Sequence, residues 1–508
     1  MSDTSANNKR IAKNTMMLYF RMLLTMGVSL YTSRVILNTL GVEDYGIYGV
    51  VGGVIWMFSF ITNSMSGATQ RFLTFELGKN NKVELQKVFN ISIEIYIILS
   101  VIILVLAETI GLWFVVNKLT IPESRMTAAI WVYQASIVTA ILSFITIPYN
   151  AVIIAHEKMS AFAYISIYEV VAKLGIVYLL DLFDFDKLKL YAILVLAIQV
   201  SIRVIYQIYA NRFFEETKIK VVWDKSKFRE MLGFAGWTLT GNISSVASTQ
   251  GINIVMNMFF GPIVNAARAI ASQVEGAVNG FVSNFQTALN PQIVKSYATN
   301  EIVHMHSLVF ASCRYSFYLL FFLSLPICFE ANTILKLWLG VVPNHTVAFL
   351  RITLLALLVN TQSNPLIVAA GATGSIKKYS LVVGTILLFN LPVVYICLLW
   401  GAPPEMALIV YLIFVFIAQA SRLYMIRPMI QLSVIEYMRK VLKPIALVVV
   451  FAVIVPMLYK ILTPDLMIHS IIICVLSLIS SLISIYVFGV GKKEKAIITN
   501  KLTQIFRK

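Results

Sequence analysis

Long apolar stretches alternate with short polar links along almost all of the 508 residues. A helix needs about 20 mostly apolar residues to cross the hydrocarbon core of a membrane. Fourteen stretches reach that length, and the longest polar link, about residues 211–229, is too short for a catalytic domain. The predicted spans are 13–39, 46–70, 88–115, 126–154, 160–181, 188–210, 230–259, 264–289, 307–329, 347–370, 379–400, 405–426, 443–462 and 467–490. The pattern predicts an all-α, polytopic membrane protein.

Polar side chains recur at steps of three or four residues along two of these spans, which places them on one helix face. An offset of 220 residues maps one set onto the other, and spans 13–39 and 230–259 carry similar hydroxyl and amide stripes. One such stripe alone is typical of helix–helix packing. Four stripes in matched positions favour the wall of a shared, water-filled cavity. The two mapped sets are Tyr45, Tyr48, Gly52, Ser59, Asn63, Ser66 and Gln70, and Asn265, Arg268, Ser272, Glu275, Asn279, Ser283, Gln286 and Asn290.

The same offset places Gly41 on Gly261 and Asn80 on Asn300, each in a link between spans. Each repeat holds six spans, and an even number starts both repeats on the same side of the membrane. The repeat is therefore parallel, with a pseudo-two-fold axis along the membrane normal. The predicted organisation is an N-terminal six-helix lobe at 1–212, a cytoplasmic linker at 213–229, a C-terminal six-helix lobe at 230–427, and two additional helices with a basic tail at 428–508.

Charge sets the orientation. Only 13% of the residues are charged, yet the formal net charge is +17. With a cytoplasmic N-terminus, 28 of the 41 Lys and Arg residues fall on the cytoplasmic side and six on the other. This is the distribution of the positive-inside rule, so the basic excess requires no nucleic-acid partner. Both termini are expected in the cytoplasm.

Seven cations inside the predicted spans are assigned to neither side of the membrane, and each costs about 2.5–3.5 kcal/mol to insert. Arg21 and Arg268 lie on polar helix faces and are predicted to face the cavity. Arg34 reaches the same cavity only if its span bends, and otherwise extends to the outer interface. The full set is Arg21, Arg34, Lys173, Arg203, Arg268, Arg314 and Arg351, of which Arg203 and Arg351 lie toward span ends, where their long side chains reach water.

Two embedded acids add a second kind of chemistry. Glu275 lies two helical turns after Arg268, and the 220 offset places Glu94 on Arg314. Opposite charges at matched positions form a gate or a structural ion pair, or the acids bind a proton or Na⁺ that drives transport. Glu94 and Glu275 are the candidate ion-coupling residues.

Three stretches are similar to a known family. "LNTLGVEDYGIYGVVGGV", "ATQRFLTFELGK" and "GPIVNAARAIASQVEGAVNGFVSNFQTALNPQIVKSYA" resemble bacterial polysaccharide repeat-unit (O-antigen) flippases of the multidrug/oligosaccharidyl-lipid/polysaccharide exporter superfamily. The resemblance implies two six-helix lobes in a V that open alternately to each side. It also implies transport of undecaprenyl-diphosphate-linked oligosaccharides across the bacterial inner membrane during lipopolysaccharide biosynthesis.

The expected cavity suits such a cargo, because guanidinium groups pair with phosphate oxygens and amides bind sugar hydroxyls. Expected partners are the lipid-linked oligosaccharide, membrane lipids, an H⁺ or Na⁺ coupling ion and other polysaccharide-assembly proteins. The membrane potential contributes about 2.3 kcal/mol per charge per 100 mV. The candidate substrate-cavity residues are Arg21, Arg34, Asn63, Arg268, Glu275, Asn279, Gln286 and Arg314.

Other functions have weaker support in the sequence. The four cysteines show no CxxC spacing and no phosphate-binding loop is present, so no metal, cofactor or ATP is expected. A multidrug/cation efflux antiporter of the same superfamily is the main alternative, although such proteins have acidic cavities and fewer spans. A polysaccharide polymerase or membrane glycosyltransferase would need a large extracytoplasmic loop, so the chain is not expected to be an enzyme.

Overall fold

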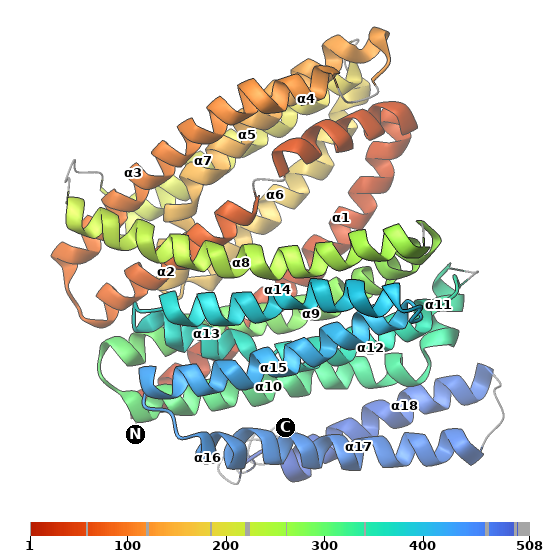
Figure 1. The fold of residues 1–508 in the computed structure, drawn as a ribbon. Coiled ribbons are helices and arrows are strands. Elements are labelled where there is room, and N and C mark those ends of the chain that lie inside the picture. Colours follow the sequence, from red (N-terminus) through yellow and green to blue (C-terminus); the bar gives the residue numbers. More distant parts are fainter. Residues whose placement is uncertain are drawn as a thin grey trace, which may run out of the picture. The chain divides into compact units, whose positions relative to one another are not determined.

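The computed structural model describes residues 2–56, 59–117, 121–182, 185–218, 224–260, 262–339, 342–462, 467–491 and 495. All regular elements in these residues are helical, which confirms the predicted all-α fold class (Figure 1). The α-helices are α1 (Ser2–Trp56), α2 (Ser59–Gly78), α3 (Lys82–Leu106), α4 (Leu112–Asn117), α5 (Glu123–Ala155), α6 (Met159–Leu179), α7 (Lys187–Phe213), α8 (Lys225–Phe260), α9 (Pro262–Ala298), α10 (Ile302–Phe329), α11 (Ala331–Leu339), α12 (Thr346–Asn360), α13 (Ser363–Ala372), α14 (Lys377–Leu399), α15 (Glu405–Met429), α16 (Val434–Tyr437), α17 (Lys443–Leu462) and α18 (Met467–Ser484).

Within the described residues, 10 helical stretches are long and apolar enough to cross a membrane. All of them coincide with predicted spans, so the chain is a multi-pass membrane protein. The four other predicted spans fall on α1, α2, α8 and α9, which carry the polar stripes. These segments are helical too, and α9 alone has 37 residues. The stripes lower their hydropathy without preventing a helix, and the count of fourteen spans and the cytoplasmic termini stay predictions.

The 220-residue repeat is visible in the backbone. Helices α2 and α9 end at Gly78 and Ala298, and α3 and α10 begin at Lys82 and Ile302. Between each pair of helices an asparagine adopts a left-handed conformation, with φ of 55° at Asn80 and 60° at Asn300. Asparagine tolerates this region better than most residues. The two turns are therefore built alike.

Gly41 shows why the repeat needs a glycine in the link between its first two spans. Its φ of 79° and ψ of 168° interrupt α1 at the predicted boundary between spans. Residues with a side chain rarely adopt such a φ. The matching residue, Gly261, lies outside the described residues.

The helices pack into two compact units, Met1–Asn242 with Val294–Asn300, and Ile243–Ile293 with Glu301–Lys508. The division passes through α8 and α9, so packing does not follow chain order at these two helices. The predicted lobe boundaries at 212 and 230 stay a prediction.

In the first unit, the core between α1, α5 and α7 contains one tight contact. Tyr133 is fully buried and its hydroxyl donates a hydrogen bond of 2.6 Å to the carbonyl of Ala107. That carbonyl lies in a π-helical turn, Ala107–Gly111, where a wider helix alters the hydrogen-bond ladder. A Cβ built on Gly111 would lie 2.2 Å from the Tyr133 hydroxyl, so a larger residue there would displace this hydroxyl from its hydrogen bond.

In the second unit, the core joins α8, α9, α12, α14 and α15 around Met256, Phe349 and Leu354. Ala267 and Ala271 are fully buried in it, and small residues let helices approach closely in a membrane. Helices α17 and α18 pack against each other, and α18 also packs on α10 (Figure 1).

A polar cavity in the second compact unit

A polar cavity of about 350 Å³ lies within the second unit, between α8, α9, α12, α13, α14 and α15. Amides and hydroxyls dominate its wall, and Arg422 is the one charged residue among the described residues that line it. Val282, Leu357, Ile367, Leu387 and Ala418 supply the apolar part of the wall. The polar lining residues are Ser245, Ser248, Asn279, Ser283, Gln286, Asn360, Thr361, Ser363, Asn364, Tyr411 and Arg422.

A proline produces the helix interruption that lines this cavity. Pro365 has no N–H, so it cannot bond the carbonyl of Thr361, four residues earlier. Gln286 of α9 replaces that donor: its Nε2 lies 2.8 Å from the Thr361 carbonyl and 3.0 Å from Ser316 Oγ. The junction of α12 and α13 is thereby stabilised inside the bundle, as broken helices in membranes require.

Arg422 enters the cavity from α15 and is only 5% exposed. Its Nε donates a hydrogen bond to Tyr379 Oη at 2.8 Å, and its Nη1 donates to Gln419 Oε1 at 2.7 Å and to Ser363 Oγ. All three acceptors are neutral and buried. The guanidinium is therefore fixed in place without neutralisation of its charge by these partners.

The stripe on α9 divides into two kinds of residue. Asn279 and Ser283 are exposed and line the cavity, whereas Gln286 is buried and already bonded to protein groups. Arg268 is 7% exposed, and its Nη1 donates a hydrogen bond of 2.8 Å to Thr353 Oγ1 of α12. The same nitrogen lies 3.9 Å from Glu275 Oε2. Arg268 thus links α9 to α12 inside the unit, and Glu275 remains the more accessible of the pair.

Arg314 lies elsewhere in the same unit. Its Nη1 is 3.4 Å from the carbonyl of Gly489, at the end of a π-helical turn (Ile485–Gly489) that follows α18. It is not among the residues described as lining the cavity. Its predicted role in the cavity stays a prediction.

The remaining candidates belong to the first unit. The Arg21 guanidinium lies 4.6 Å from the ring centre of Phe162 in α6. Glu94 of α3 is partly buried, and its Oε2 has no hydrogen-bond partner among the described residues. The side chains of Arg34 and Asn63 lie outside the described residues.

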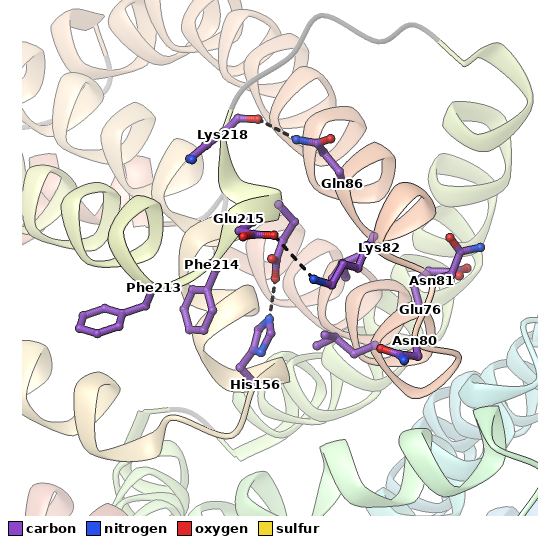
Figure 2. A pocket seen from close by; sticks show the side chains of 13 residues that line it. Glu76, Asn80, Asn81, Lys82, Gln86, His156, Phe213, Phe214, Glu215 and Lys218 are labelled. Carbon is purple, nitrogen blue, oxygen red and sulfur yellow. Dashed lines mark hydrogen bonds and ion pairs between the residues drawn. The ribbon is translucent and has the colours of Figure 1, made fainter.

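The first unit has a larger cavity of about 650 Å³, beside the ends of α2, α5 and α7 (Figure 2). The Nε2 atom of His156 lies 2.5 Å from Oε1 of Glu216. Figure 2 shows Lys82 directed toward Glu215, and 3.7 Å separate Nζ from Oε2. Burial by itself raises the pKa of Glu216. The hydrogen bonds from His156 and the backbone, with nearby positive charge, lower this pKa by a larger amount, so it lies below its usual value. The pairs His156–Glu216 and Lys82–Glu215 occupy four of the titratable side chains that line this cavity, so these four are less available to a charged ligand.

No group of three or more His, Cys, Asp or Glu side chains in the described part of the chain could hold a metal ion. The chemistry of the second-unit cavity is hydrogen bonding by amides and hydroxyls, together with one positive charge. Such a wall can bind a polar, hydroxyl-rich or anionic molecule.

No protein-family model and no curated protein matches the chain. Solved structures do match it. A multidrug resistance MATE family transporter of the MOP superfamily, in an outward-facing conformation, has a TM-score of 0.68 at 15% identity, over 83% of this chain and 96% of that chain. The chain has the fold of a MATE transporter.

Two further MATE structures support this likeness. MATE in the bent conformation gives a TM-score of 0.70 at 14% identity, over 84% of this chain and 96% of that one. The Vibrio cholerae MATE transporter VcmN in the bent form gives 0.65 at 18% identity, over 87% and 100%. The fold is therefore the one that the resemblance implied, while the superfamily and the O-antigen flippase type stay predictions.

Arg422 is the most buried Lys or Arg among the described residues, yet it is not one of the seven embedded cations named from the sequence. It lies near the end of the predicted span 405–426, where the 28 cytoplasmic basic residues were counted. A signal was present. Gln419 and Arg422 are three residues apart on one face of an apolar helix, and Ser363 and Asn364 precede a proline inside a predicted span. Both features place polar groups within spans, where they require partners.

Proposed function

We propose that the chain is a membrane transporter that exports lipid-linked oligosaccharide by alternating access. The observation that carries this proposal is the wall of the second-unit cavity. Amides and hydroxyls such as Asn279, Asn360 and Ser283 donate to and accept from sugar hydroxyls. Among the described residues of this wall, none is an Asp or Glu, so the wall has no carboxylate to bind a cationic drug.

The proposed direction is from the cytoplasmic to the outer leaflet of a bacterial inner membrane. Its support is the distribution of basic residues, which places both termini in the cytoplasm. A membrane potential drives export of a negative head group. Glu94 and Glu275 are the proposed ion-coupling acids, because both are embedded and Glu94 has a carboxylate oxygen without a hydrogen bond among the described residues.

Multidrug efflux is a second candidate, and the comparisons favour it over the first. One matched structure is named a multidrug resistance transporter, and the matches cover more than four-fifths of this chain. Glu94 and Glu275 are the acids that a cationic drug would meet. In this case, proton or Na⁺ exchange at these acids would power export.

The deciding experiment reconstitutes the purified protein in liposomes with defined ion gradients. Uptake of a fluorescent undecaprenyl-diphosphate-linked oligosaccharide is measured beside uptake of a fluorescent cationic dye. Transport of the oligosaccharide alone supports the first proposal, and transport of the dye alone supports the second. No transport of either under any gradient would contradict both.

Two variants connect transport to the cavity. Asn279→Trp fills part of it and should abolish oligosaccharide transport. Ile413→Trp adds the same side chain at an α15 position that is 51% exposed and does not line the cavity. Equal transport by both variants would show that the cargo does not use this cavity.

A further inference from the structure

The charge of Arg422 is unusual within this chain. Arginine stays protonated in proteins, and a buried charge is costly unless an opposite charge lies beside it. Two other cations follow that rule: Lys460 lies 2.7 Å from Glu330, and Arg125 contacts both Asp44 and Asp186. Arg422 lies deeper than any of these cations, yet its described partners are two hydroxyls and an amide oxygen.

The guanidinium is also positioned to bind something further. Nε and Nη1 hold it to Tyr379, Ser363 and Gln419. No described residue accepts a hydrogen bond from Nη2, and the side chain borders the cavity. Two anchored nitrogens fix the plane of the group, so Nη2 is presented in a defined direction at little entropic cost.

We propose that this cavity binds a phosphate-type oxyanion, with Arg422 supplying the missing counter-charge. The inference rests on the proposed function, because it concerns the same cavity and names the part of the cargo held there. Asn360 and Asn364 lie in the same wall and can donate to the remaining oxygens of the anion. A volume of about 350 Å³ is at the lower end for ligand cavities, about 300–1,000 Å³, so the site takes the head group with the adjoining sugar rather than a whole oligosaccharide.

The first unit supplies a matched control. Arg203 of α7 is 219 residues before Arg422 of α15, in line with the internal repeat. Its guanidinium lies 4.4 Å from the ring centre of Tyr149. It borders neither the second-unit cavity nor the charged cavity of the first unit. Arg203→Gln therefore removes an embedded arginine without touching the proposed site.

The test measures thermal unfolding of the full-length protein in nanodiscs at increasing inorganic pyrophosphate. A ligand that binds only the folded state raises the unfolding midpoint, and the rise grows with the logarithm of the ligand concentration once that concentration exceeds the Kd. The wild type and Arg203→Gln should show the same rise, and Arg422→Gln should need at least tenfold more pyrophosphate to reach it. An unchanged response of Arg422→Gln, or no response of the wild type, would overturn the proposal.

A second variant tests the proposal independently, in case Arg422→Gln does not fold. Ser363→Asp places a carboxylate beside the guanidinium, at the first residue of α13, where an acid is also favoured by the helix dipole. We expect this protein to unfold at a higher temperature than wild type without ligand, and to lose its response to pyrophosphate. If Ser363→Asp still responds like wild type, Arg422 is not the anion contact.

Two further arms identify the source of the phosphate and separate this inference from the proposed function. A short polyprenyl diphosphate in the nanodisc should outcompete inorganic pyrophosphate if the natural ligand is a lipid head group, and equal competition assigns a free anion. Pyrophosphate binding without oligosaccharide transport would refute the function and keep the anion site. Oligosaccharide transport by Arg422→Gln at the wild-type rate would refute the anion site and keep the function.

Discussion

The two compact units use different chemistry at matched positions. In the first unit, the start of α5 is tied to the start of α7 by Arg125, whose Nη1 lies 2.6 Å from Asp186 and whose Nε lies 2.8 Å from Asp44. In the second unit, the start of α12 is tied to the start of α15 by His345, whose Nδ1 lies 2.5 Å from Glu405. His345 follows Arg125 by 220 residues and Glu405 follows Asp186 by 219.

The difference shows what the repeat preserved. Both units keep a polar side-chain contact where the same two helices begin, but one uses a permanently charged arginine with two acids and the other a histidine with one. The embedded arginines differ likewise, since Arg203 lies over an aromatic ring and Arg422 contacts hydroxyls and an amide beside a cavity. Helix positions were kept while the polar partners diverged, so each unit can serve a separate task.

Loss of Arg125 should cause the largest decrease in the free energy of unfolding among these tests of the two units. Arg125→Ala leaves Asp44 and Asp186 facing each other without a cation, and each is at most a quarter exposed. We expect a loss of about 3 kcal/mol in the free energy of unfolding. Chemical denaturation in detergent measures it, with Arg125→Lys as a control that keeps the charge. A loss below about 0.5 kcal/mol, the usual value for an exposed ion pair, would remove the distinction between the two contacts.

Loss of Gln286 should cause the next largest decrease in the free energy of unfolding. This substitution tests the structure of the second unit alone. Gln286→Leu leaves the carbonyl of Thr361 without the donor that replaces the missing N–H of Pro365. We expect a loss of about 2 kcal/mol, the cost of a buried unsatisfied acceptor. The exposed neighbour Ser283 supplies the control, because Ser283→Ala should be close to neutral in the same denaturation assay. Equal effects of the two variants would show that the helix interruption does not depend on Gln286.

The contact between His345 and Glu405 in the second unit should stabilise the fold less than the contacts of Arg125 in the first. The side chains of His345 and Glu405 are 37% and 24% exposed, and solvent weakens such pairs. His345→Ala should therefore cost about 0.5 kcal/mol. A loss as large as that of Arg125→Ala would mean that the two contacts stabilise the fold equally, contrary to the expected difference between the units.

The smallest expected effect is the pH dependence of stability that Asp186 produces in the first unit. Burial raises the pKa of Asp186, but hydrogen bonds from Arg125 and the Lys189 backbone, with their charges, lower it by more, so the net pKa lies below its ordinary value. An acid with a depressed pKa stabilises the fold above its unfolded-state pKa, about 3.9, and this is lost as pH falls through the folded value. The gap in unfolding temperature between wild type and Asp186→Asn should thus be constant above about pH 5 and shrink below about pH 4. A gap that stays constant over this range would exclude the shift.

Local sequence patterns were sufficient for much of the fold. Apolar runs predicted every long helix. Steps of three or four residues placed Asn279 and Ser283 on one face of α9, where both border the cavity, because helix periodicity is a property of the backbone. The 220 offset predicted matched turns at Asn80 and Asn300, and both adopt positive φ. These features depend on residues close together in the chain, so they can be read from it directly.

Only the tertiary structure decided which polar groups remain available. Arg268 and Gln286 share a stripe with Asn279, yet the first two are bonded to α12 and to the residue that follows it, while Asn279 borders the cavity. By sequence Arg422 is one basic residue near the end of a helix. In the structure it is buried, because α13 and α14 supply Ser363 and Tyr379 as its hydrogen-bond partners. Whether a side chain is free or already paired depends on helices far away in the sequence, because a hydrogen bond of about 3 Å requires packing that no local periodicity encodes.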